Sequence, residues 1–332
     1  MKTKFNSTLG PVIDRFVTLK RSMGLNYTEQ AKILLLLDRF LTDPGNGFHD
    51  LTPEAYLKWC QSFSRLSNST RRLWMQTTRD LCRYRRRCEP TCFVPDSATL
   101  PSRQQPVRPY IFSVSEIQRL LDQSSGLKRH LYSPLRPDLF RLVIVLLFTT
   151  GLRHKELLRL TVGDYDPVAG TLLIRASKFH KSRLLPLPRD VSQEVDHYLA
   201  TRRRCLLPET AETPLVWCHC KGGRAYSSFG LWRNVRLLFK RAGIQKPDGR
   251  LPRIHDFRHS FAVNALLRWY RAGVDVQAKL PLLSAYLGHV NIASTYYYLH
   301  FVESLASLAS ARFASHYGAL VNRSTRQKGG AR

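Results

Sequence analysis

The sequence predicts a mainly α-helical protein of two domains, with a small β-hairpin or sheet in the second domain. Apolar residues recur at helical spacing along most of the chain. The segment 91–109 interrupts this periodicity, and its Pro and Ser content is typical of a linker. A chain of 332 residues also exceeds the roughly 100–200 residues of a single domain.

The first domain, residues 1–90, is predicted to contain four helices. Apolar periodicity places them at residues 9–22, 28–41, 52–64 and 68–87. Thr52 followed by Pro53 predicts a helix start, because threonine caps free N–H groups and proline suits the first helical turn. Four such helices form a small all-α domain.

The second domain is expected over residues 110–315. Ser113 and Glu116 have the spacing of a capping box, which predicts a helix start there. A long apolar helix is expected at 137–159, and helices return after the β-segments. Two short runs have the composition of strands joined by a polar turn: 171–176 and 183–187. The last segment, 316–332, is a basic tail.

The charge of the chain points to a polyanionic partner. Lys and Arg number 52 against 24 Asp and Glu, a net charge of +28. Nucleic acid is the favoured partner, and an anionic membrane surface is the weaker alternative. The apolar run Leu142–Phe148 is far shorter than the ~20 residues of a membrane span. Asp14 and Arg15 interrupt the N-terminal segment, so we expect neither a signal peptide nor a membrane protein.

The cysteines indicate a reducing compartment and no metal centre. There are seven, an odd number spread thinly along the chain. Cys88 with Cys92, and Cys218 with Cys220, lack the spacing of a structural zinc site. We therefore expect no metal and no cofactor.

The fourth predicted helix carries an arginine stripe. Steps of seven, four and three residues place Arg72, Arg79, Arg83 and Arg86 on one helical face. Guanidinium groups match phosphate oxygens, so the stripe predicts contact with DNA. The alternative is an ordinary solvated surface.

Residues with catalytic potential gather in the second domain. Arg153 lies in the segment TGLRHKEL, which also contains Glu156, and His255 and Arg258 form an H-x-x-R motif. His289 ends the tripeptide LGH, and Tyr298 follows it by nine residues. Lys178 lies in the predicted hairpin turn. Each motif alone fits a surface residue, a helix-end ion pair or a core aromatic residue.

Taken in order, these motifs resemble the tyrosine recombinase (phage integrase) family. Lys178 is followed by Arg183 and by Pro186-Leu187, as in the family's hairpin, and the spacing from His289 to Tyr298 is the usual one. The resemblance implies a helical core-binding domain followed by a mixed α/β catalytic domain. Lys181 is a competing hairpin lysine, and Tyr296 and Tyr297 flank Tyr298, but the spacings favour Lys178 and Tyr298.

The resemblance implies a chemical role for each motif, and the roles suit the residue types. The two arginines, Arg153 and Arg258, would hold the non-bridging oxygens of a DNA phosphate. Tyr298 would attack it and form a 3′-phosphotyrosyl bond, with His255 as the candidate base. Lys178 would protonate the leaving 5′ oxygen.

Two further residues would support this reaction. His289 would donate to a phosphate oxygen or position the tyrosine. Glu156 would orient the arginines and a histidine without touching the phosphate itself.

The predicted activity is site-specific recombination by strand cleavage and rejoining, for integration or transposition of a bacterial mobile element. The expected partners are double-stranded DNA and further copies of the chain in a tetramer on paired sites, with other recombinases of the same element as candidates. The expected location is the cytoplasm, on the nucleoid. A helix beginning at Glu303 could dock on a neighbouring subunit or on its own domain. A type IB topoisomerase-like enzyme and a catalytically silent DNA-binding accessory protein are the alternatives.

Overall fold

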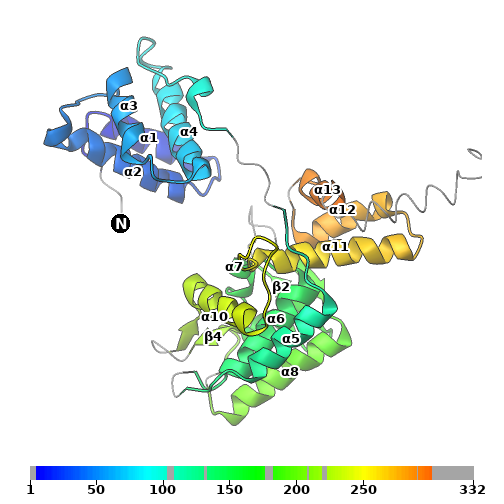
Figure 1. Cartoon of the computed structure of the whole chain (residues 1–332). Coiled ribbons are helices and arrows are strands. Elements are labelled where there is room, and N and C mark those ends of the chain that lie inside the picture. The colour runs from blue at the N-terminus through cyan, green and yellow to red at the C-terminus, as the bar shows by residue number, and fades with distance from the viewer. Residues whose placement is uncertain are drawn as a thin grey trace, which may run out of the picture. The chain divides into compact units, whose positions relative to one another are not determined.

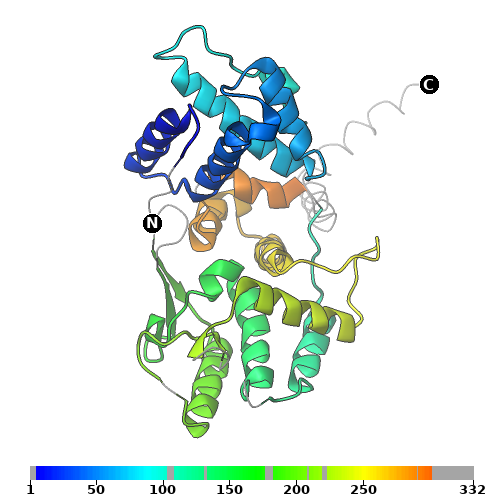
Figure 2. The same ribbon diagram turned by 90° about the vertical axis from the view of Figure 1, so that its left-hand side faces the viewer.

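The computed structural model describes residues 5–102, 108–130, 133–175, 182–207, 209–218, 223–289 and 291–300. The chain forms two compact units, residues 1–107 and 108–332 (Figures 1 and 2). Within these ranges helices dominate both units, and the strands form two small antiparallel sheets in the second unit. None of the helices in these described ranges is long and apolar enough to cross a bilayer.

The described part of the first unit contains four α-helices, as the periodicity predicts. They are α1 (Gly10–Ser22), α2 (Thr28–Thr42), α3 (Pro53–Ser62) and α4 (Asn68–Arg85). Thr52 caps α3 by accepting a hydrogen bond from the Ala55 N–H at 3.2 Å, so the predicted helix start is confirmed. Leu34, Leu37 and Trp59 lie in the buried core of this unit.

The segment after α4 returns along the same unit. Phe93, Val94 and Leu100 pack against its core, and a short 3-10 helix spans Ser97–Thr99. Much of the segment that the sequence predicts as a linker is therefore packed on the helices. The proline-rich composition conceals this, because the other anchoring groups are backbone carbonyls that accept from arginines of α4 and its C-cap, and no residue pattern reveals them.

The second unit is built around the apolar helix α6 (Arg136–Thr150). It packs against α5 (Val114–Ser125), α8 (Arg189–Arg204) and α11 (His255–Arg271). The predicted capping box of α5 is confirmed, because Ser113 Oγ accepts from the Glu116 N–H and Glu116 Oε2 accepts from the Ser113 N–H. The remaining helices of the described part are α7 (His154–Leu157), α10 (Ser228–Arg241), α12 (Val276–Leu287) and α13 (Ala293–His300).

The prediction of one helix over 137–159 is wrong. The helix ends at Thr150 because Gly151 adopts a left-handed conformation with φ +62°, which is typical of a helix C-cap. A Cβ on Gly151 would lie 2.7 Å from Cδ1 of Phe261, so the site also requires glycine for space. As a result Arg153 lies in a turn and forms the N-cap of α7.

The predicted hairpin is confirmed as part of a three-stranded antiparallel sheet. β2 (Thr171–Ile174) pairs with β3 (Arg183–Pro186), and Ile174 lies opposite Arg183. The sequence did not predict β1 (Tyr165–Asp166) or the pair β4 (Trp217–Cys218) and β5 (Arg224–Ala225). Strands of two residues are too short to show the alternation from which strands are recognised.

Candidate active site

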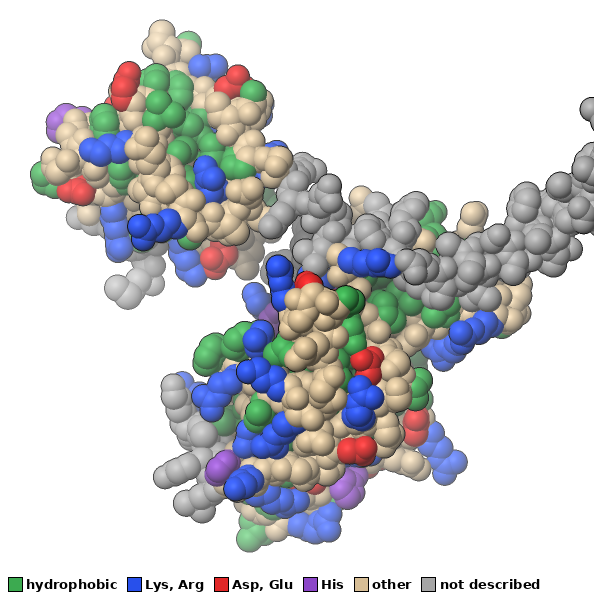
Figure 3. All heavy atoms as spheres, viewed as in Figure 1, with side chains coloured by type: hydrophobic (Ala, Val, Ile, Leu, Met, Phe, Trp, Pro, Cys, Tyr) green, Lys and Arg blue, Asp and Glu red, His purple; other side chains and the backbone are tan. Residues whose placement is uncertain are grey.

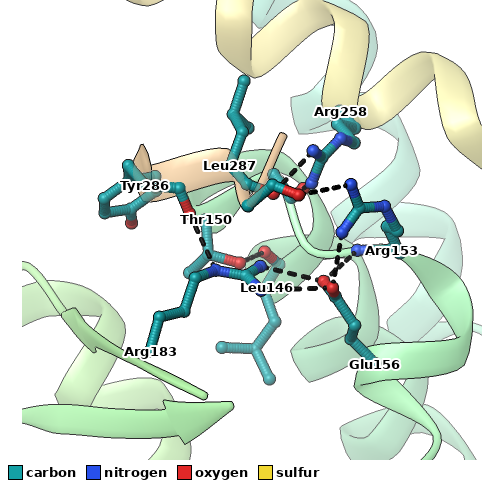
Figure 4. A network of polar contacts seen from close by, with 10 residues as sticks. Leu146, Thr150, Arg153, Glu156, Arg183, Arg258, Tyr286 and Leu287 are labelled. Atoms are coloured by element: carbon teal, nitrogen blue, oxygen red, sulfur yellow. Dashed lines mark hydrogen bonds and ion pairs between the residues drawn. The ribbon is translucent and has the colours of Figure 1, made fainter. Parts of the chain in front are cut away.

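Arg153 is held at the turn between α6 and α7 (Figure 4). Its Nη1 donates to Oε1 of Glu156 at 2.7 Å, and its backbone N–H donates to Oε2 at 3.0 Å. Its Nη2 donates to the carbonyl of Gly288 at 2.9 Å. The side chain is therefore fixed at both ends of its guanidinium group, on the turn that Gly151 creates.

Arg258 reaches the same place from α11. Its side chain is 1% exposed, with Nη1 on the carbonyl of Gly151 at 2.8 Å and Nη2 on the carbonyl of Leu287 at 2.6 Å. Within the described residues its buried Nε has no hydrogen-bond partner. Burial and the nearby charge of Arg153 lower the pKa of Arg258 to about 10, so the group remains charged at neutral pH. One donor of a buried cation is thus left for another ligand.

Glu156 is the carboxylate that joins two arginines. It is 6% exposed and accepts from Arg153 on one side and from Arg183 on the other. Burial alone would raise the pKa of Glu156, but the hydrogen bonds and charges of Arg183 and Arg153 lower it to about 2. The carboxylate is therefore ionised at neutral pH and offsets part of the positive charge.

The end of α12 accepts one hydrogen bond from each of three arginines. Arg183 Nε donates to the carbonyl of Tyr286 at 2.8 Å. Arg258 and Arg153 donate to the next two carbonyls, those of Leu287 and Gly288 (Figure 4). The last carbonyls of a helix carry partial negative charge, so this end stabilises a cluster of cations.

Two histidines flank the arginines. His255 begins α11, and desolvation within the site together with the charge of Arg258 lowers its pKa to about 4. The residue is exposed at the surface of the unit, so the ring is accessible, and its low pKa keeps it neutral at neutral pH. His289 follows the left-handed Gly288, and its Nδ1 is hydrogen-bonded to Oγ1 of Thr295 at 2.9 Å. Burial and the charge of Arg258 lower the pKa of His289 to about 3.

Tyr298 lies on α13 beside these histidines. It is 2% exposed, and its ring centroid lies 6.3 Å from that of His289 in a stacked arrangement. It also contacts His259 with centroids 5.5 Å apart. The adjacent Tyr296 is 42% exposed instead. The structure thus brings Tyr298 into the site that contains Arg153, Arg258 and His289.

These motifs agree with a known family over most of the second unit. The model of the phage integrase family matches residues 112–304. The chain belongs to the phage integrase family. It is therefore a site-specific recombinase of the tyrosine type.

Individual relatives support this assignment. An integrase/recombinase homologue of Sinorhizobium fredii, y4rB, is 34% identical over 88% of this chain and 93% of its own length. Tyrosine recombinase XerD of Halalkalibacterium halodurans is 30% identical over 59% of this chain and 58% of its own.

Solved structures share the fold. XerH site-specific recombinase aligns with a TM-score of 0.62 at 21% identity, over 90% of this chain and 83% of its own. The Tn1549 transposon integrase aligns with a TM-score of 0.61 at 16% identity, over 92% of this chain and 98% of its own.

Several predicted features of this integrase lie outside the described residues. Lys178 and the competing Lys181 fall within 176–181, and the predicted helix from Glu303 and the basic tail 316–332 fall within 301–332. The other predicted catalytic residues and Glu156 are described, and they gather from five segments: the α6–α7 turn, α7, α11, the end of α12 and α13.

The predicted DNA-binding arginines of α4 divide into two groups. Arg72, Arg79 and Arg86 donate to backbone carbonyls of the returning segment, those of Pro101 at 2.6 Å, Pro95 at 2.9 Å and Cys92 at 3.1 Å. Arg83 is exposed. Arg72 and Arg79 are half-buried, so their first role is to fasten the returning segment to the unit.

Sequence reasoning missed two residues of the site. Arg183 entered only as a marker of the hairpin spacing, although it binds Glu156 and α12. His259 lies between His255 and Tyr298, with its centroid 4.7 Å from that of His255. A signal for His259 was present, because residues four apart share a helix face. The signal for Arg183 was weaker, since its partners are remote in sequence.

Proposed function

We propose that this integrase cleaves and rejoins double-stranded DNA through Tyr298, in the integration or transposition of a mobile element. The observation that carries this proposal is the convergence of Arg153, Arg258, two neutral histidines and a buried tyrosine at one site. Each supplies a part that phosphoryl transfer to a phenol requires.

Cleavage is a transesterification. The phenolic oxygen of Tyr298 attacks the scissile phosphorus, a tyrosyl O–P bond forms and the P–O5′ bond breaks. The phenolic proton passes to the neutral ring of His255, and Lys178 gives a proton to the 5′ oxygen. The products are a 3′-phosphotyrosyl bond and a free 5′-hydroxyl. Rejoining is the reverse reaction, so it needs no nucleotide cofactor.

The arginines act on the charge that develops at the phosphate. We assign two donors to the non-bridging oxygens: the buried Nε of Arg258, which has no partner among the described residues, and the partly exposed guanidinium of Arg153. Donors fixed in a water-poor site are worth roughly 3–4 kcal/mol each to the transition state. The low pKa of His255 keeps its ring ready to accept a proton at neutral pH.

Charge supports DNA as the partner. The net charge is +28, and Figure 3 shows many Lys and Arg side chains and few acidic ones on the visible face of the second unit. XerH has been solved bound to its difH substrate, and the Tn1549 integrase in complex with transposon right end DNA. We extend the proposal to a tetramer on paired sites, to other recombinases of the same element as partners, and to the nucleoid as its location.

Covalent trapping tests the proposal. Nicked duplexes tiled from the DNA on either side of the coding sequence should yield a protein–DNA adduct that survives denaturation. Tyr298→Phe should abolish the adduct while DNA binding persists, because only the attacking oxygen is removed. Tyr296→Phe is the matched control and should keep it. An undiminished adduct in Tyr298→Phe would disprove the assignment of the nucleophile.

A plasmid relaxation assay and the same duplexes distinguish the two alternative functions. A topoisomerase-like enzyme would relax a supercoiled plasmid that carries none of the flanking DNA, and we expect no relaxation. A silent accessory protein would bind the duplexes without forming any adduct.

A further inference from the structure

Arg183 is the arginine of the site to which neither the motifs nor the reaction assigns a role. We propose that Arg183 is a positioning residue for cleavage, which locks Glu156 and the end of α12 so that Arg153 faces the scissile phosphate. The proposal rests on the proposed function, because it concerns the same reaction.

Arg183 binds both oxygens of the Glu156 carboxylate. Its Nη1 and Nη2 donate to Oε1 and Oε2 of Glu156 at 3.1 and 2.9 Å. Arg153 binds the same two oxygens through its own Nη1 and its backbone N–H. A carboxylate gripped by a bidentate fork cannot rotate, so its second arginine is held in one orientation. Without Arg183, the contacts that Glu156 would keep among the described residues are those to Arg153.

The third contact ties Arg183 to the turn that carries His289. Nε donates to the carbonyl of Tyr286, the first of the three arginine-bound carbonyls. A Cβ on Gly288 would lie 2.9 Å from Nη1 of Arg183, so the turn passes directly over this guanidinium. Arg183 therefore contacts both the support of Arg153 and the segment that positions His289.

Its hydrogen-bond partners distinguish Arg183 from the arginines that would touch DNA; burial alone does not, because Arg258 is only 1% exposed. The Arg183 side chain is 12% exposed, against 25% for Arg153, and all three of its nitrogen atoms donate to protein acceptors. Arg258 by contrast has a nitrogen without a protein partner in the described ranges. Arg183 thus acts through its neighbours and not on the phosphate.

The first test compares cleavage rates of full-length variants. Single-turnover adduct formation is measured on the nicked duplex that traps the wild-type chain. Arg183→Met should lower the rate by about 10–100-fold, the cost of a small misplacement of a reacting group. Arg183→Lys should not restore it, because an ammonium group lacks the bidentate fork. DNA affinity should change little.

Arg141→Met is the matched control. Arg141 also holds a carboxylate by two nitrogens, with Nε 2.9 Å from Oε2 of Glu194, but it joins α6 to α8 away from the site. The Arg141→Met variant should cleave at the wild-type rate. A combined Arg183→Met, Glu156→Gln variant should be little slower than the slower single variant, because both changes break one connection.

Modified substrates identify the group through which Arg183 acts. A methylphosphonate at the scissile position carries no charge and depends less on arginine, so the deficit of Arg183→Met should shrink on it. A 5′-bridging sulfur leaves without a proton donor, and the deficit should persist on it. Misfolded protein would be slow on every substrate.

Four results would overturn the proposal. They are full activity of Arg183→Lys, an equal deficit on all substrates, rescue by the sulfur substrate, and a wild-type rate in Arg183→Met. Failure of the wild-type chain to form any adduct would instead contradict the proposed function, and this inference with it.

Discussion

At the level of single residues, backbone carbonyls and one carboxylate balance the charge of the active site. Arg153, Arg183 and Arg258 each donate to a carbonyl at the end of α12, and Glu156 serves two of them. A buried cation is costly unless such partners surround it. The arrangement keeps three guanidinium groups together before any phosphate is bound.

Replacing Glu156 with glutamine should destabilise the second unit as well as slow cleavage. The variant leaves two arginines without their shared carboxylate, and breaking a buried ion pair costs about 3–5 kcal/mol. Urea denaturation followed by circular dichroism measures the free energy of unfolding. Glu194→Gln is the control and should cost only about 0–1 kcal/mol, because its bridge to Arg141 is partly exposed. Equal losses in the two variants would contradict this view of Glu156.

The histidines predict how stability depends on pH. Burial and the charge of His255 lower the pKa of His259 to about 4, and burial and Arg258 lower that of His289 to about 3. The unfolded chain binds these protons near pH 6.5 and the folded chain does not, so stability is full above that pH. It should fall as the pH drops toward 4, by up to about 1.4 kcal/mol per pH unit for each histidine.

Denaturant titrations at pH 7.5 and 5.5 measure this loss. His259→Gln should reduce the difference between the two pH values, because one titrating group is removed. A wild-type protein that is more stable at pH 5.5 than at 7.5 would contradict the prediction.

At the level of elements, two glycines end helices where arginines need room. Gly151 ends α6 with φ +62°, and Gly288 ends α12 with φ +66°. The first supplies its carbonyl to Arg258 and the second to Arg153. Both helices therefore end with a carbonyl directed at a guanidinium group, and the left-handed turn carries the chain onward to Arg153 or to His289.

Gly288→Ala should separate the cost of the turn from its catalytic role. An alanine at this φ costs roughly 1–2 kcal/mol, and its Cβ would also press on Nη1 of Arg183. Gly243 has φ +63° and nothing within 4 Å of a Cβ, so Gly243→Ala should lose similar stability. Only Gly288→Ala should slow adduct formation. A comparable slowing in both variants would indicate a general loss of folded protein.

At the level of the whole molecule, the positive charge serves two purposes. Part of it fastens the chain to itself, as Arg72 and Arg79 do on the segment after α4. The rest is available to a polyanion, as the exposed Arg83 is. The net charge of +28 alone does not distinguish these uses.

Two substitutions on α4 should distinguish the arginines that bind DNA from those that fasten the chain to itself. Arg83→Gln should reduce the slope of log affinity for duplex DNA against log salt by about 1, because one phosphate contact is lost. It should leave the free energy of unfolding unchanged. Arg79→Gln should instead destabilise the chain by about 1 kcal/mol through the lost hydrogen bond to Pro95. Salt titrations and urea denaturation of both variants check this, and identical behaviour would contradict the division.

Much of the fold followed from signals that are local in sequence. Helical periodicity predicted the four N-terminal helices, and the caps at Thr52 and Ser113 were confirmed. The family motifs named Tyr298, Arg153 and Arg258, which the structure brings together. Helical periodicity, caps and short motifs each involve residues a few positions apart, so a single sequence is enough to recognise them.

The support of the site depends on contacts between distant segments. Arg153 meets Gly288 across 135 positions and Arg183 meets Glu156 across 27. The inward turn of Arg72 toward Pro101 likewise depends on where a later segment returns. A guanidinium group donates to any carbonyl or carboxylate that folding brings near it, and sequence patterns do not encode the positions of backbone carbonyls. The motifs therefore identified which residues react, while the three-dimensional packing determined which residues hold them in place.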